Sequence, residues 1–183
     1  MPTEHLLASA ADLTGHLHRL AHLLAARHAD FGQTVLLGLQ NGGAPVAERL
    51  QHLLTDLTGT APRLGLLDAT FHRDDYRRRP LHGPPAANAT RIDFALEDQR
   101  VVLIDDVLFS GRTVRAALDA LLTYGRPTAV ELLVVIDRRG QRALPIEATY
   151  VGLAVDTRPT DDVRVRWAGF RGAPEDGAFL ITD

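Results

Sequence analysis

The sequence predicts an α/β domain built on a parallel β-sheet with helices on both faces. Short apolar runs typical of buried strands alternate with helical segments along the chain, which is the pattern of βαβ units. The length of 183 residues suits one domain, and the 45% hydrophobic fraction is enough to fill its core. Ligands of such sheets bind beyond the carboxyl ends of the strands, so we expect the functional site in the loops at that edge.

The first third of the chain predicts helices and strands in alternation. Leu13, Leu17, Leu20 and Leu24 lie on one stripe of an amphipathic helix. The run TVLLGL is a buried strand, and a glycine-containing turn and a second helix follow it. The expected elements are a helix over 9–28, a strand over 34–39, a turn over 40–43, a helix over 44–57 and a strand over 63–71.

The rest of the chain continues the alternation after a long polar segment. Residues 72–91 are rich in turn formers, and an irregular segment of this length in a compact domain is more often a functional flap than a connector. The elements expected beyond it are a strand over 101–104, a helix over 113–124, a strand over 130–136 and short strands over 150–155, 163–167 and 178–181.

Composition excludes several chemistries. All 20 basic residues are arginine, and the chain has neither lysine nor cysteine. Schiff-base lysines, P-loop lysines, thiol nucleophiles, disulfides and cysteine zinc sites are therefore ruled out. The net charge of −3 argues against a globally basic nucleic-acid binder. No signal peptide or membrane-length apolar run is evident, so we expect a cytoplasmic protein.

The most informative segment is VVLIDDVLFSGRT, residues 101–113. Asp105 and Asp106 follow an apolar strand, and small residues then open a helix. Backbone N–H groups at a helix N-terminus favour a phosphate, whereas adjacent carboxylates suit vicinal hydroxyls or hydrated Mg²⁺. A ribose 5-phosphate satisfies both features at once. The plainer interpretation is a strand-to-helix loop in which the two aspartates only cap and solvate.

This segment resembles the phosphoribosyl-pyrophosphate (PRPP) signature of the type I phosphoribosyltransferases. Further segments are similar to one subfamily, the pyrimidine-operon attenuators with uracil phosphoribosyltransferase activity (PyrR type). The matching segments are LDATFHRDD at 67–75, DAL at 119–121, GRP at 125–127, VIDR at 135–138, LPI at 144–146 and YVG at 150–152.

The resemblance implies a type I phosphoribosyltransferase-like fold over residues 1–183 as one domain. It would comprise a parallel sheet flanked by helices, a flap at about 72–91 and a small hood from the N- and C-terminal segments. The implied reaction converts uracil and PRPP, carried with Mg²⁺, to UMP and pyrophosphate. The implied partners are PRPP, uracil, UMP or UTP, and pyrimidine-operon leader mRNA, and the implied assembly is a homo-oligomer, dimer or tetramer.

The resemblance also assigns roles to residues. Asp105, Asp106 and Arg73 would be catalytic, and no firm protein ligand for Mg²⁺ is implied. The substrate-binding set is Asn41, Gly42, Arg91, Asp105, Asp106, Val107, Leu108, Phe109, Ser110, Gly111, Arg112, Thr113, Arg138 and Val163. The RNA-binding set is His18, Arg19, His22 and Arg142. For the histidines, a solvated helix face is the alternative interpretation.

The chain departs from the subfamily at several positions. Asn41-Gly42-Gly43 stands where the family has Thr-Arg-Gly in its pyrophosphate turn, and the lost charge-assisted contact is worth about 1.5–3 kcal/mol. Glu147 and Leu153 replace an arginine and a lysine, which would weaken attraction to RNA phosphates. Two alternatives therefore stay open: a regulator with vestigial catalysis, and a purine salvage phosphoribosyltransferase. The second is disfavoured because those enzymes use a lysine to recognise the purine.

Overall fold

The computed structural model describes residues 2–29, 31–72 and 89–182, and Arg73 and most of the expected flap lie outside them. The elements are β1 (Thr3–Ala8), α1 (Ala10–His28), β2 (Thr34–Leu39), α2 (Gly43–Thr58), β3 (Arg63–Leu67), the 3₁₀ turn η1 (Thr70–His72), β4 (Arg100–Leu108), α3 (Arg112–Leu121), β5 (Ala129–Arg139), β6 (Tyr150–Asp156), β7 (Asp162–Arg166) and β8 (Gly177–Thr182).

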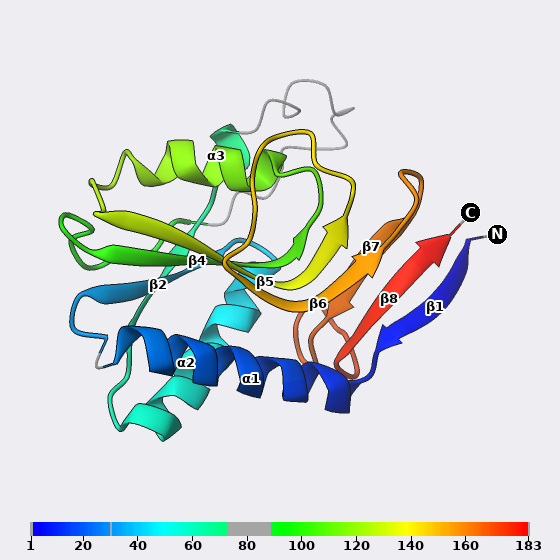
Figure 1. Ribbon diagram of the computed structural model, residues 1–183, viewed down its shortest axis with the longest axis horizontal. Coiled ribbons are helices and arrows are strands. Elements are labelled where there is room, and N and C mark those ends of the chain that lie inside the picture. The colour runs from blue at the N-terminus through cyan, green and yellow to red at the C-terminus, as the bar shows by residue number, and fades with distance from the viewer. Residues whose placement is uncertain (1, 30, 73–88, 183) are drawn as a thin grey trace.

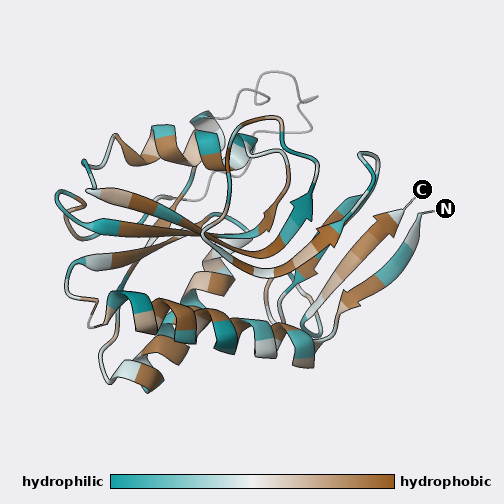
Figure 2. Ribbon diagram, viewed as in Figure 1, coloured by the Kyte–Doolittle hydropathy of each residue, from teal (hydrophilic) through white to brown (hydrophobic). Residues whose placement is uncertain are grey.

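The central feature is a five-stranded parallel sheet in the order β3-β2-β4-β5-β6. Helices α1 and α2 cover one face and α3 covers the other (Figure 1). Alternate residues of β4 serve the two cores: Val102 and Ile104 pack with α1 and α2, whereas Val101 and Leu103 pack with α3. Figure 2 shows the strands and the inward helix faces as predominantly hydrophobic. The sheet is thus buried on both faces, as the apolar strand runs predict.

A second, antiparallel sheet in the order β1-β8-β7 joins the two ends of the chain beside the main sheet (Figure 1). It corresponds to the hood that the resemblance implies. Strands β7 and β8 lie near their expected positions, but β1 has no counterpart among the expected elements. Its sequence, TEHLLA, does not alternate cleanly, and most of its residues are exposed.

Four elements, β3, β4, α3 and β5, end three or four residues from their expected positions. Strand β3 ends at Leu67 because Asp68 Oδ1 accepts a hydrogen bond from Thr70 N at 2.8 Å, which turns the chain into η1. Strand β4 continues through both aspartates to Leu108 because β5 is itself longer than expected and pairs with it that far. Helix α3 ends at Leu121, where tighter turns begin.

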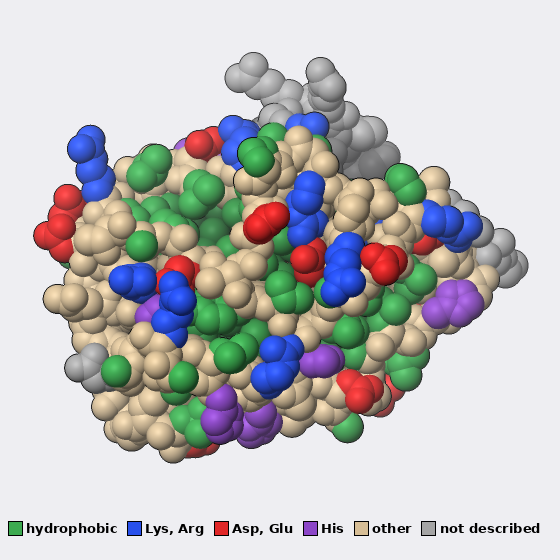
Figure 3. Space-filling view, in the orientation of Figure 1, with side chains coloured by type: hydrophobic (Ala, Val, Ile, Leu, Met, Phe, Trp, Pro, Cys, Tyr) green, Lys and Arg blue, Asp and Glu red, His purple; other side chains and the backbone are tan. Residues whose placement is uncertain are grey.

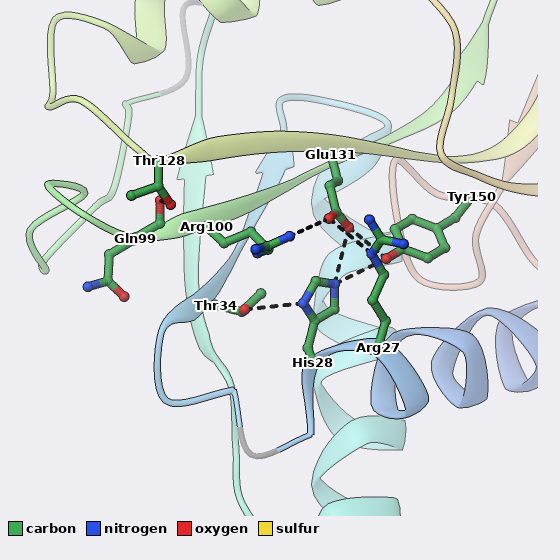
Figure 4. A network of polar contacts seen from close by, with 8 residues as sticks. All are labelled: Arg27, His28, Thr34, Gln99, Arg100, Thr128, Glu131 and Tyr150. Atoms are coloured by element: carbon green, nitrogen blue, oxygen red, sulfur yellow. Dashed lines mark hydrogen bonds and ion pairs between the residues drawn. The ribbon is translucent and has the colours of Figure 1, made fainter.

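A polar cluster closes the edge of the sheet at which the strands begin (Figure 4). The buried carboxylate of Glu131, at the start of β5, contacts Arg27 and Arg100 at 3.1 and 3.0 Å. It also accepts a 2.6 Å hydrogen bond from the Tyr150 hydroxyl and lies 3.2 Å from His28 Nε2. Five described groups thereby satisfy one another on the side of the sheet away from its carboxyl ends.

None of the helices in the described part of the chain has the length and apolar character of a membrane span.

Candidate functional site

The candidate site lies where β2, β4 and β5 end. Strand β4 pairs with β2 only as far as Ile104, whereas its pairing with β5 continues to Leu108. From Asp105 onward, the β2-facing edge of β4 is therefore free of strand pairing. The turn after β2 packs against this edge, so residues from two neighbouring strands meet at the aspartate pair.

The two aspartates are held by backbone groups. Asp105 Oδ1 accepts a hydrogen bond from Asp106 N at 3.0 Å, and Asp106 Oδ1 accepts one from Val107 N at 2.8 Å. Burial raises the pKa of Asp106 above its ordinary value, although these hydrogen bonds and the positive charge of Arg171 act in the opposite direction. The pKa of Asp106 is therefore set by its burial on one side and by neighbouring hydrogen-bond donors and positive charge on the other.

The turn over residues 40–43 approaches the end of β4 so closely that a side chain at Gly42 or Gly43 would force a neighbouring group to move. A Cβ atom at Gly42 would lie 2.2 Å from Asp106 Oδ2, and one at Gly43 would lie 2.0 Å from the Ile104 carbonyl oxygen. Gln40 N donates to the Leu67 carbonyl at 2.9 Å, which ties the turn to β3, and the Gln40–Asn41 peptide bond is cis. The glycines therefore let the backbone of this turn reach the carboxylate.

The loop from β4 into α3 is the segment predicted to bind phosphate. Gly111 precedes the helix with φ +85°, a conformation that L side chains rarely adopt, so the loop requires glycine there. Arg115 N donates to the Gly111 carbonyl at 2.9 Å and starts the helix. Ser110 and Thr113 are half-buried and Arg112 is exposed. The backbone N–H groups of the first helical turn remain suited to an anion.

Arg142 stabilises the β4–α3 loop through hydrogen bonds to backbone carbonyl oxygens. Its guanidinium donates to the carbonyl oxygens of Phe109, Arg138 and Ile146 at 2.6, 3.0 and 3.0 Å, and it forms an ion pair with Asp137. This residue was expected to contact RNA together with the α1 side chains. The structure places its guanidinium against the β4–α3 loop, where these donors bind the protein itself, and its contact with RNA stays a prediction.

A cavity of about 430 Å³ opens beside Asp106 and Gly42. Its opposite wall comes from the end of β7 and the loop that follows. The lining residues are Gly42, Asp106, Val165, Arg166, Trp167, Phe170, Arg171, Gly172, Ala173 and Pro174. The cavity therefore lies between the main sheet and the hood, next to the segment that resembles a PRPP signature.

The other predicted substrate-binding residues have different surroundings. Arg138 is buried, donates to the Asp161 carbonyl at 2.7 Å and stacks 3.9 Å from the ring centroid of Phe109, so it supports the loop. Val163 is buried in the core, whereas Val165, two residues further along β7, lines the cavity. Exposed Arg91 pairs through its backbone with Leu66 of β3. Val107 is half-buried and Leu108 is buried.

The predicted RNA-binding residues of α1 lie on its outer face. His18 and His22 are exposed, and Figure 3 shows histidine and arginine side chains gathered over the region of α1. Arg19 is turned toward β6, where its guanidinium donates to the Val151 carbonyl at 2.9 Å and to that of Gly152. The structure thus keeps His18 and His22 accessible together but assigns Arg19 a contact within the protein.

The hood side of the cavity was not predicted from the sequence. Trp167, Phe170 and Arg171 belong to a segment in which no chemical motif is visible. Two glycines with positive φ, Gly169 and Gly172, mark it as a turn, but a turn signal does not reveal what lies opposite. Trp167, Phe170 and Arg171 reach the cavity beside Asp106 because β7 pairs with β8, and no local sequence pattern encodes that pairing.

Comparison with known proteins defines the class first. The phosphoribosyl transferase domain model matches residues 11–166. Among solved structures, a hypoxanthine phosphoribosyltransferase from Staphylococcus aureus superposes with a TM-score of 0.68 at 19% identity, covering 94% of this chain and 90% of that one. The enzyme from Leishmania tarentolae in complex with GMP gives 0.66 at 16% identity, with coverages of 87% and 84%. These two likenesses concern the fold.

Relatives identify the group within that class. The bifunctional protein PyrR of Chloroflexus aurantiacus is 42% identical over 176 residues, which is 96% of this chain and 94% of the relative. The bifunctional protein PyrR of Desulfosudis oleivorans is 43% identical over 149 residues, 81% of each chain. The chain therefore belongs to the phosphoribosyltransferase family and, within it, to the bifunctional PyrR proteins.

Proposed function

We propose that the protein is a pyrimidine-operon regulator that also transfers phosphoribose from PRPP to uracil, giving UMP and pyrophosphate. The observation that carries the enzymatic part is the shared cavity wall of Asp106 and Gly42. It joins an aspartate of the PRPP-like segment to the glycine turn that follows β2. Ribose hydroxyls and pyrophosphate are the neighbouring parts of PRPP, and these two elements would receive them.

In the proposed reaction, uracil N1 bonds to the anomeric carbon as the bond from that carbon to the pyrophosphate oxygen breaks. Pyrophosphate leaves with the electron pair of that bond, and the N1 proton is released. Asp105 and Asp106 would hold the ribose hydroxyls, and the first turn of α3 would hold the 5-phosphate. A carboxylate of Asp106 would also stabilise positive charge developing on the ribose.

Magnesium is part of the proposal as an ion carried by PRPP. Within the described residues, no three histidine or acidic side chains gather as a metal site. The ion would take most of its oxygen ligands from pyrophosphate and water, with Asp105 and Asp106 as the nearby carboxylates. When bound, Mg²⁺ would neutralise charge on the leaving group.

A base panel tests the enzymatic proposal. Purified protein with PRPP and Mg²⁺ is given uracil, hypoxanthine or guanine, and nucleotide formation is followed chromatographically. We expect UMP from uracil and no purine nucleotide. A preference for hypoxanthine would support the purine salvage alternative. The PyrR relatives at 40% identity or more argue against that alternative.

The regulatory part of the proposal assigns His18 and His22 to contact leader mRNA. Both are exposed on one face of α1, and a groove of about 260 Å³ beside them is lined by His18, Arg49 and His52 among others. The double variant His18→Gln/His22→Gln should weaken binding of a pyrimidine-operon leader hairpin and leave UMP formation intact. Equal affinity of the native protein for a scrambled hairpin would exclude the regulatory role.

Two further parts of the proposal follow the resemblance. We place the protein in the cytoplasm, where PRPP and nascent mRNA occur together, and we expect a homo-oligomer. Light scattering after size-exclusion chromatography separates dimer from tetramer. A catalytically inactive regulator is the second candidate, and Gly42 in place of an arginine favours it. Tight UMP binding without turnover would support that candidate.

A further inference from the structure

We propose that Arg171, in the hood loop, supplies the cation that binds the pyrophosphate of PRPP, a proposal that rests on the proposed function. It would do so across the cavity from Gly42, where the family has an arginine. Pyrophosphate is a strongly anionic leaving group, and the turn over residues 40–43 has no basic side chain to bind it.

The first observation is position. Arg171, Gly42 and Asp106 line the same cavity from opposite sides. Arg171 and the turn therefore border a common space, and the positive charge of Arg171 acts to lower the pKa of Asp106. An anion lying over the Gly42 backbone would therefore meet Arg171 on its other side.

The second observation is availability. Among the described residues, the Arg171 guanidinium has no hydrogen-bond or ion-pair partner, and its aromatic neighbour is Phe170, 5.4 Å from the ring centroid. Arg166, the other cavity arginine, is paired with Glu4 and stacked on Phe179. The chain has no lysine to take the role. Arg171 is thus the cavity cation whose donors remain open.

The third observation is the way the loop is fixed. Asp176 Oδ1 accepts hydrogen bonds from Ala168 N at 2.6 Å and from Arg49 of α2 at 3.0 Å, so the loop is tied to the main body at its base. Arg171 itself has φ +51°, which is unfavourable for a residue with a side chain.

The fourth observation is an unmet donor. Trp167 lines the cavity and is 1% exposed, yet its indole Nε1 has no hydrogen-bond partner in the described part of the chain. Buried donors are normally satisfied, so a bound acceptor or water is expected near it. Trp167 is also the only tryptophan of the sequence, and its fluorescence therefore reports on this cavity alone.

The test compares native protein with Arg171→Gln in fluorescence titrations with pyrophosphate plus Mg²⁺ and, separately, with UMP. Glutamine retains a Cβ and a polar stem, so the backbone conformation at 171 is equally unfavourable in both proteins. Losing a charge-assisted contact should raise the pyrophosphate Kd and the KM for PRPP by about 10- to 100-fold. UMP, which lacks pyrophosphate, should bind nearly as before, and Arg171→Lys should retain most of the affinity.

Arg164→Gln is the matched control, because Arg164 is exposed on β7 and paired with Asp162 outside the cavity lining. It should leave both affinities unchanged. If the native protein makes UMP and Arg171→Gln binds pyrophosphate equally well, this inference is wrong and the proposed function stands. If the native protein neither binds pyrophosphate nor makes UMP, both are overturned. An equal loss of UMP and pyrophosphate binding would show that Arg171 only shapes the loop, which also contradicts the inference.

Discussion

The Asp106 carboxylate occupies the space that a side chain at Gly42 would need, with Oδ2 only 2.2 Å from the position of a Cβ atom there. This contact joins the turn after β2 to the end of β4. It also gives a physical reason for the glycine: with Asp106 in its present position, an arginine at 42 cannot be accommodated. The loss of the turn arginine and the position of Asp106 are therefore one structural feature.

Gly42→Ala should displace the Asp106 carboxylate and lower the rate of UMP formation by roughly 100-fold, the typical cost of misplacing a reacting group by about 1 Å. The matched control is Gly15→Ala in α1, where nothing lies within 4 Å of the new Cβ atom. That change should preserve activity and stabilise the protein by about 0.5–1 kcal/mol. Full activity in Gly42→Ala would show that the contact has no role.

Asp106→Asn should separate stability from activity. Burial raises the pKa of Asp106, so the folded protein disfavours its charged form. The stability that Asp106 contributes is present below its unfolded pKa and is lost as the pH rises through the folded pKa. At neutral pH, asparagine should therefore increase the free energy of unfolding while lowering turnover by about 100- to 1,000-fold. Urea unfolding at pH 7 checks the first effect; a less stable variant would contradict the stated burial effect.

Arg142→Met should act on the enzyme site rather than on RNA. Removing the guanidinium leaves the carbonyl oxygens of Phe109, Arg138 and Ile146 without their donor, at a cost of about 2–4 kcal/mol in stability. The β4–α3 loop should loosen, and the KM for PRPP should rise. A variant of native stability and turnover that fails to bind leader RNA would contradict this expectation and support the RNA role predicted from the sequence.

Stability should fall in two steps as the pH is lowered. Burial lowers the pKa of His28 below 6.5, so the unfolded chain takes up this proton first and the free energy of unfolding falls below that pH. Burial alone would raise the pKa of Glu131, but its hydrogen bonds with Tyr150 and Arg100 outweigh that effect and bring it below 4.5, which gives the second step. Burial also lowers the pKa of His16, so both histidines contribute to the first step. His28→Gln should make that step smaller in urea titrations, whereas exposed His5→Gln should leave it unchanged.

The parallel sheet and the PRPP-like loop were predictable because both depend on local patterns. Apolar runs mark β2, β4 and β5, and Asp105, Asp106 and the glycine at 111 lie within one short segment. The strand β1 was missed because its stability comes from pairing with β8 at the other end of the chain. The same dependence on distant pairing hid Arg171, which reaches the site through the β7–β8 turn.

The roles of individual arginines were the least predictable part. Arg19, Arg138 and Arg142 all belong to segments that match the family, yet their guanidinium groups bind carbonyl oxygens of the protein. A sequence shows that a cation is present but not which acceptors the fold brings to it. The approach of Gly42 to Asp106 was hidden for the same reason, since it depends on how two strands end side by side.

The most direct test of the central claim is the stoichiometry of products from uracil, PRPP and Mg²⁺. UMP and pyrophosphate are quantified together, with native protein and with the double variant Asp105→Asn/Asp106→Asn. We expect the two products in equal amounts from the native protein and a loss of both in the variant. Pyrophosphate without UMP, or equal rates from the two proteins, would contradict this expectation.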